Sequence, residues 1–550
     1  MRTKSFFKWL LFSLLLLQIH STVFAQNIYE NHRTEVYGYI ARMAQKGLVE
    51  VDDYIQPISR QAILLALLEI QKKQQSLTKL EQSELKFYLQ EYNTIQVVSN
   101  KDNTTADFIK KDANGRWRTL AIHSKDFQFN LDPIANIQVS SSDGHKINQI
   151  SNGFNLWGTS KNFGFQMYYR DYTETGDFDK ITSFENPNTG IILVGLSTPT
   201  KINYSEVRGN LSYSWKNGSV NIGKDNLLWG YGENGRIVLS DKSPSYPYFR
   251  LDYKPLKWLS FNYMHAWLNS NLVDTSRSYN TWTGGVSGDQ RILYIPKFLV
   301  THSIKFTPMK GLDLAIGESM VYSDKLDVGF LIPVNFYKVY DNNRSNYLIN
   351  AGSNGQVFMQ ASSRNQIKNT HLYTTLFIDE IRMSEIFNAA KSRNQLGYTI
   401  GGSVTDFLIS YLTLGVEYTR VNPFVYNNLI PAQKYTQYDY FLGDWMGSNM
   451  DRQLFFIKYT PLPKLKLYAR YQRIRKGGEG SIWDQYAAEP QPAFLYNYNK
   501  TRKDIYFQAN YELIHNLYLK GVYQHISETY STGTKLNSSI FQLGVAFGLN

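Results

Sequence analysis

Apolar and polar residues alternate along most of the chain, from about residue 121 to the C-terminus. Successive side chains of a β-strand point to opposite faces, so this period of two predicts strands with one apolar and one polar face. The clearest segments are residues 163–170, 207–215, 412–419, 465–471, 505–513 and 541–547. Strands of about 9–11 residues cross a bilayer when tilted, and the length available accommodates roughly 16–18 of them.

Residues 34–92 have the period of an α-helix instead. We expect a first helix at residues 34–46, a second that begins near Ser59, and a third that begins at Thr78. Glu81 follows Thr78 by three residues, which is the spacing of a capping box. Three short helices form a small bundle whose core is near the lower limit for independent stability. We therefore expect the bundle to dock on a larger structure.

The first 25 residues have the pattern of a cleaved secretory signal peptide. A basic start containing Arg2, Lys4 and Lys8 precedes an apolar stretch from Trp9 to Ile19. That stretch is shorter than the ~20 residues of a membrane-spanning helix. After residue 25 no run of 18 apolar residues occurs. If the mature chain spans a membrane, it must do so as a closed barrel, because an open sheet would leave backbone groups unpaired in hydrocarbon.

These patterns predict four regions. They are a signal peptide (1–25), a helical periplasmic region (26–95), a polar linker without periodicity (96–120), and an outer-membrane β-barrel (121–550).

A soluble β-sandwich, propeller or lectin would also show alternation. Two features favour a barrel. Several apolar faces end in an aromatic residue, as at Trp215, Tyr418 and Tyr471, which is typical of the aromatic girdle at a membrane–water interface. The last segment, residues 541–547, is an amphipathic strand close to the C-terminus. We therefore predict an all-β transmembrane barrel with a small N-terminal α-helical bundle, which is exported to the outer membrane of a Gram-negative cell.

Composition limits the classes of molecule that the chain is expected to bind. The chain has 41 tyrosines and no cysteine, and its formal net charge is +12. The absence of cysteine excludes disulfides and thiol nucleophiles. A basic chain attracts nucleic acid, anionic lipid or an acidic polymer. Because export excludes nucleic acid, outer-membrane lipid and an acidic polymer remain as expected partners.

Catalytic signatures are missing. The sequence has no G-x-S-x-G elbow, no H-E-x-x-H metal helix, no P-loop and no dinucleotide fingerprint. Asp379 and Glu380 are neighbours on a predicted strand, so their side chains point to opposite faces and do not form one acid–base pair. We predict no enzymatic activity, no catalytic residue, no bound metal and no cofactor.

The stretch from Asn221 to Tyr253 has the densest set of candidate binding residues. These are Asp225, Trp229, Tyr231 and Arg236. Aromatic rings stack on the apolar faces of sugars, and the charged groups form hydrogen bonds with hydroxyls or carboxylates. The alternative interpretation is a glycine-rich turn at a strand end that packs its aromatic side chains inside the barrel.

Several short motifs, in the same order along the chain, resemble those of the capsule assembly Wzi family, in its Bacteroidota-type members. The matching segments are Gly47-Leu48 with Pro57, Ser59 and Arg60; Gly223-Lys224-Asp225 with Trp229-Gly230-Tyr231-Gly232 and Leu239-Ser240; Phe377-Ile378-Asp379-Glu380; Val416-Glu417-Tyr418-Thr419; and Leu442-Gly443. The family usually has a proline at the position of Tyr231.

The resemblance implies an 18-stranded outer-membrane barrel with its helical bundle on the periplasmic side. It implies a surface lectin that anchors capsular or other extracellular polysaccharide without catalysis. Asp379 and Arg382 are then further candidates for glycan binding. A porin or transporter, and an accessory component of another export or assembly system, remain as alternative functions. The helical region is also a candidate contact for periplasmic proteins.

Overall fold

The computed structural model describes residues 28–93, 105–112, 115–124, 126–282, 288–347, 352–380, 388, 391 and 393–548. The predicted signal peptide lies outside the described residues.

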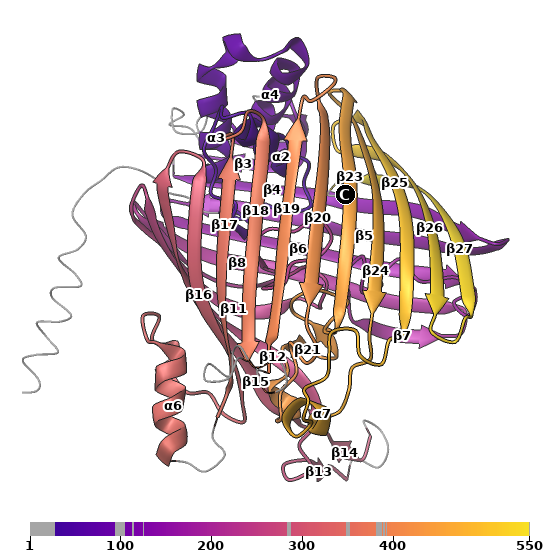
Figure 1. Cartoon of the computed structure of the whole chain (residues 1–550). Helices are drawn as coiled ribbons and strands as arrows, with labels where there is room; N and C mark the ends of the chain where they lie inside the picture. The colour runs from indigo at the N-terminus through magenta and orange to yellow at the C-terminus, as the bar shows by residue number, and fades with distance from the viewer. Residues whose placement is uncertain are drawn as a thin grey trace, which may run out of the picture.

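Eighteen antiparallel strands form a closed barrel (Figure 1). In order around the barrel they are β4 (Phe127–Ser142), β5 (His145–Ser160), β6 (Phe163–Gly176), β8 (Lys201–Trp215), β9 (Gly218–Asp225), β11 (Tyr246–Leu256), β12 (Leu259–Val273), β15 (Tyr294–Met309), β16 (Leu312–Ser323), β17 (Asn354–Arg364), β18 (Thr370–Glu380), β19 (Gln395–Thr405), β20 (Leu412–Val421), β23 (Met450–Leu462), β24 (Leu465–Lys476), β25 (Lys500–Ile514), β26 (Leu517–Tyr530) and β27 (Lys535–Phe547). The last strand pairs with the first, with Leu543 opposite Val139. The predicted fold class is confirmed.

Neighbouring residues of a strand face opposite sides of the barrel wall, as the alternation predicts. On β25, Ile505 and Phe507 are 38% and 50% exposed, whereas Asp504 is 0% and Asn510 is 8% exposed. An apolar outer face and a polar interior are the properties of a transmembrane barrel. No helix among the described residues is long and apolar enough to cross a membrane.

Two strands occupy part of the predicted linker at residues 96–120, which corrects that prediction. They are β2 (Thr105–Lys111) and β3 (Trp117–His123). β3 pairs with the part of β4 near Leu131, outside the segment that pairs with β27. β2 pairs with β3, and its described side chains are mostly exposed. Because neither face of β2 is buried, its sequence carries no alternating pattern.

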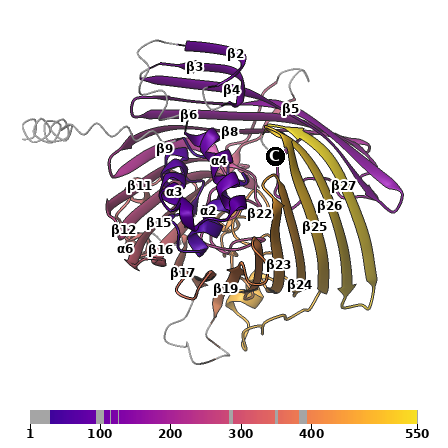
Figure 2. The ribbon, with the colours of Figure 1, turned by 90° about the horizontal axis from the view of Figure 1, so that it is seen from above.

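The N-terminal helices form where the sequence predicts them. They are α2 (Val36–Gln45), α3 (Arg60–Lys72) and α4 (Lys79–Tyr92). The Ser59 hydroxyl caps α3, and Thr78 and Glu81 form the predicted capping box of α4. Seen from above, the three helices lie within the outline of the barrel mouth (Figure 2). The larger structure on which the bundle was expected to dock is therefore the barrel.

The bundle contacts the barrel at the end where the connections between strands are short. Arg42 pairs with Asp406, in the turn between β19 and β20, at 2.5 Å. At the opposite end most connections are long, and two of them contain α6 (Tyr337–Tyr347) and α7 (Ile482–Tyr486) (Figure 1). Short turns face the periplasm and long loops face the cell exterior in outer-membrane barrels. This rule agrees with the predicted periplasmic position of the bundle, which stays a prediction.

Two of the long connections fold back into the lumen. We call residues 226–245 and 422–449 the plug. Ser240 donates its backbone N–H to Leu442 O at 2.8 Å, and the Tyr435 hydroxyl donates to Val238 O at 3.0 Å. Buried side chains from both segments form an apolar core inside the barrel. The plug therefore fills part of the lumen.

The remaining elements are short. They are β1 (Ile55–Gln56), β7 (Val194–Thr198), β10 (Leu228–Trp229), β13 (Tyr279–Asn280), β14 (Gln290–Arg291), β21 (Thr436–Gln437) and β22 (Tyr440–Phe441), together with the 3-10 helices Gln74–Ser76, Val328–Leu331 and Pro431–Gln433.

Candidate functional site

The predicted binding residues Trp229 and Tyr231 lie inside the plug. β10, which contains Trp229, pairs with β1 from the segment between α2 and α3. The Trp229 indole is 1% exposed and donates its Nε1–H to the Tyr54 hydroxyl at 3.0 Å. The Tyr231 hydroxyl donates to Asp53 Oδ1 at 3.1 Å. These side chains join the plug to the N-terminal region, as the packing interpretation expects.

Arg236 belongs to the same loop, whereas Asp225 lies at the end of β9. The Arg236 Nη1 group donates to Gly230 O at 2.5 Å, within the loop. Asp225 is 3.4 Å from Arg208 on β8. The structure therefore places Trp229, Tyr231 and Arg236 in one loop, with Asp225 next to it. Their role in glycan binding stays a prediction.

The second group of candidates is separate. Asp379 accepts a hydrogen bond from Gln356 Nε2 at 3.1 Å and from the backbone N–H of Tyr426 at 2.7 Å. Its neighbour Glu380 pairs instead with Arg393 at 2.8 Å. As expected, the two adjacent carboxylates do not share a site. Arg382 lies outside the described residues.

The lumen contains a cavity of about 870 Å³, which we call the lumen cavity. Its walls are the bundle, the plug, residues 182–189 and the inner faces of β23 to β27. The sequence did not predict this cavity as a unit. The alternation of residues showed which side chains face inward, but it did not show which inward residues the plug leaves uncovered.

Positive charge is in excess in the lumen cavity. Eight basic residues line it: Arg33, Arg42, Lys242, Lys458, Lys466, Arg470, Arg502 and Lys520. Five acidic residues line it: Glu35, Glu84, Glu185, Glu233 and Asp241. Such a wall raises the local concentration of anions.

Most of these cations have a carboxylate partner, but two have none among the described residues. Lys458 pairs with Glu233 at 2.9 Å, for example. Arg470 lies over the ring of Tyr506 at 4.6 Å, and Lys520 lines the cavity nearby. Among the described residues, no carboxylate lies within 4.0 Å of either group. Arg470 and Lys520 are therefore available to an acidic ligand.

The rest of the wall suits a hydroxylated ligand. Side-chain amides of Gln138, Asn186, Asn188, Asn234, Gln508, Asn510, Gln524 and Gln542 line the cavity. Aromatic rings of Tyr39, Phe184, Tyr411, Trp445, Tyr459, Tyr468 and Tyr506 lie among them. Amides both donate and accept hydrogen bonds, and aromatic rings offer flat apolar faces. This combination matches the two kinds of surface that a sugar ring presents.

Two carboxyl groups, one in the plug and one that lines the same cavity, have shifted pKa values. Burial alone would raise the pKa of Asp241, but Lys242, His32 and Arg33 around it hold that pKa well below its usual value. Burial raises the pKa of Glu185 to about 7, against the opposing effect of Arg33. The charge of the cavity therefore changes near neutral pH.

Metal binding has no candidate among the described residues, where no group of three or more His, Asp or Glu side chains could hold an ion.

Comparisons with known proteins identify the fold. No protein-family model and no curated protein sequence matches the chain. The solved structure of Wzi from Escherichia coli, described as an outer-membrane carbohydrate-binding β-barrel involved in group 1 capsule assembly, matches with a TM-score of 0.58. The two chains are 10% identical, and the match covers 95% of this chain and 99% of Wzi.

Two porin structures from Pseudomonas aeruginosa match less well. OprD has a TM-score of 0.41 at 11% identity, over 76% of this chain and 94% of OprD. OccD3 (OpdP) has a TM-score of 0.42 at 11% identity, over 84% of this chain and 98% of OccD3. The fold and the lumen together define an outer-membrane β-barrel with a plug. Within that class, the chain has a Wzi-like fold.

Proposed function

We propose that this protein lies in the outer membrane and anchors an acidic capsular or other extracellular polysaccharide to the cell surface, without catalysis. The polysaccharide binds in the lumen cavity, which it enters from the side of the long loops. The signal peptide at residues 1–25 directs export and is removed. Membership of the capsule assembly Wzi family is part of the same proposal, and the carbohydrate-binding description of the structurally similar E. coli Wzi supports it.

The observation that carries the proposal is the pair of cations without carboxylate partners. A buried or half-buried charge that has no partner is costly, unless a ligand or water compensates it. Arg470 and Lys520 are both half-buried. A uronate or other anionic group of a glycan would compensate them, while the surrounding amides bind hydroxyl groups. A repeating polymer adds further weak contacts, which raises the overall affinity.

The residues predicted from sequence take a supporting role in this proposal. Trp229, Tyr231 and Arg236 hold the loop that presents Glu233 and Asn234 to the lumen cavity. Asp379 fixes the other plug segment through the backbone of Tyr426. We propose that these groups, with Asp225, act on glycan binding by shaping the cavity.

Binding of a glycan array by purified, refolded protein tests the proposal. We expect binding of acidic glycans. We expect the double variant Arg470→Gln/Lys520→Gln to lose about tenfold in affinity, equivalent to ~1.4 kcal/mol. The matched control is Lys72→Gln/Lys86→Gln, which removes the same charge from exposed positions of the bundle. In cells, deletion of the gene should release polymer into the medium without stopping its synthesis. Equal binding by the two double variants, or a polymer that stays attached after deletion, would refute the proposal.

A further inference from the structure

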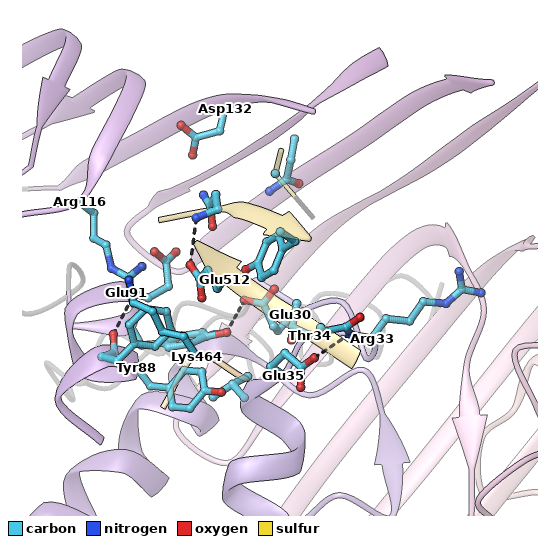
Figure 3. A pocket seen from close by; sticks show the side chains of 18 of the residues that line it. Glu30, Arg33, Thr34, Glu35, Tyr88, Glu91, Arg116, Asp132, Lys464 and Glu512 are labelled. Carbon is cyan, nitrogen blue, oxygen red and sulfur yellow. Dashed lines mark hydrogen bonds between the residues drawn. The ribbon is translucent and has the colours of Figure 1, made fainter. Parts of the chain in front are cut away.

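A second cavity, of about 320 Å³, lies at the periplasmic end of the barrel between the bundle and the wall. Figure 3 shows the charged side chains that line it, from the bundle and from the wall. Its lining includes Lys464 and Asn516, which lie in the short turns between β23 and β24 and between β25 and β26. This cavity, which we call the rim cavity, therefore reaches the periplasmic rim.

The rim cavity and the lumen cavity lie next to each other and share part of their lining. The residues that line both are Arg33, Glu35, Lys466, Gln508, Asn510 and Lys520. From this shared segment the lumen cavity extends to Ile526 on β26 and Ile540 on β27, towards the end of the barrel where most connections are long. The two cavities therefore lie in series along the inner faces of β24 to β27, beside the plug and the bundle.

We infer that the two cavities join through their shared segment into a passage, and that this passage conducts small inorganic anions, such as chloride, between the two sides of the outer membrane. This activity goes beyond the proposed anchoring function, which needs no conduction. Three of the six shared residues are cations and one is an anion. Basic residues that line a narrow polar path favour anions over cations.

The shared segment is polar enough to hold water. Glu35 Oε1 accepts a hydrogen bond from Asn510 Nδ2 at 3.3 Å, which links the segment before α2 to β25. Asn510 Oδ1 in this segment and Arg470 Nε in the lumen cavity are buried and have no hydrogen-bond partner among the described residues. Buried polar atoms are normally satisfied by protein or water. Water along the passage satisfies these atoms and carries the ions.

Conductance of the purified mature protein in planar lipid bilayers, with a potassium chloride gradient, tests the inference. We expect stable single-channel currents with a reversal potential that favours chloride. Arg33→Glu reverses one charge in the shared segment. The reversal potential should therefore shift towards the value expected for a cation-selective channel. Lys72→Glu makes the same change on the exposed surface of the bundle, and it should leave the reversal potential unchanged.

Single cysteines locate the path, because the chain has no cysteine of its own. Gln508→Cys places a thiol in the shared segment, and Phe507→Cys places one on the outer face of the same strand. A water-soluble, negatively charged methanethiosulfonate reagent should remove most of the conductance of the first variant and none from the second.

Two outcomes overturn the inference. One is a correctly folded, glycan-binding protein with no conductance above the lipid background, which leaves the anchoring function intact. The other is a conductance that the reagent at position 508 does not change. A protein that conducts anions but binds no glycan would instead refute the proposed function and leave this inference standing.

Discussion

The indole N–H of Trp229 donates a hydrogen bond to the hydroxyl of Tyr54 across 3.0 Å, although the two residues are 175 positions apart in the sequence. The two rings meet edge to face, with centroids 6.2 Å apart. Trp229 comes from a loop between two barrel strands, and Tyr54 from the segment between two helices of the bundle. The plug and the N-terminal region are thus one packed unit.

Replacing Trp229 should destabilise this unit. Trp229→Ala removes a fully buried side chain, and such a change costs about 3–5 kcal/mol. We expect the denaturation midpoint, followed by tryptophan fluorescence, to fall, while the barrel keeps its heat-modifiable migration in gels. Glycan binding should fall with it. Trp282→Ala is the control, because Trp282 is 85% exposed. Equal stability of the two variants would contradict the packing role.

Removing Arg42 should loosen the bundle from the barrel. Arg42 pairs with Glu81 at 2.7 Å as well as with Asp406, and Glu81 is 0% exposed. Breaking a buried ion pair costs ~3–5 kcal/mol, and we expect the lower part of this range because Lys46 also contacts Glu81. Limited proteolysis of Arg42→Ala should cut the bundle faster than in the parent protein. Lys72→Ala should not change the rate, and a similar rate in both variants would exclude this anchoring contact.

Glycan binding should depend on pH through Glu185. Its pKa is raised to about 7, so the carboxyl takes up a proton as the pH falls below 7. The lumen cavity then loses a negative charge, and acidic glycans should bind more tightly at pH 6 than at pH 8. Glu185→Gln should bind at pH 8 as the parent does at pH 6. Glu69→Gln, on the outer surface of the bundle, is the control. If the Glu185→Gln variant kept the same pH dependence, another titrating group would be its cause.

Salt should weaken binding of acidic glycans and leave neutral glycans unaffected. The Debye length shortens from about 10 Å at 0.1 M to about 3 Å at 1 M salt, so the attraction between the cavity and a polyanion is screened. Titrations by isothermal calorimetry at both salt concentrations measure this. The parent protein should lose more affinity than the Arg470→Gln/Lys520→Gln variant. The same salt dependence in both proteins would mean that other charges hold the glycan.

Local patterns were enough to predict some elements. The capping box of Thr78 and Glu81 lies within four consecutive residues, so the sequence alone identifies the start of α4. The alternation at residues 505–513 identifies both faces of β25, because a buried interior and an apolar exterior each select their own residue types. The edge strand β2 is the opposite case. Its described side chains are mostly exposed on both faces, so its sequence has no alternation of apolar and polar residues.

The sequence by itself determined that the chain is a barrel with a helical bundle, because lipid, water and the backbone hydrogen bonds impose regular periods on it. Only the tertiary structure decided where the long loops go. It buried Trp229 against Tyr54, and it left Arg470 and Lys520 uncovered beside the plug. These outcomes depend on contacts between residues more than a hundred positions apart, and a local periodicity in the sequence does not predict such contacts.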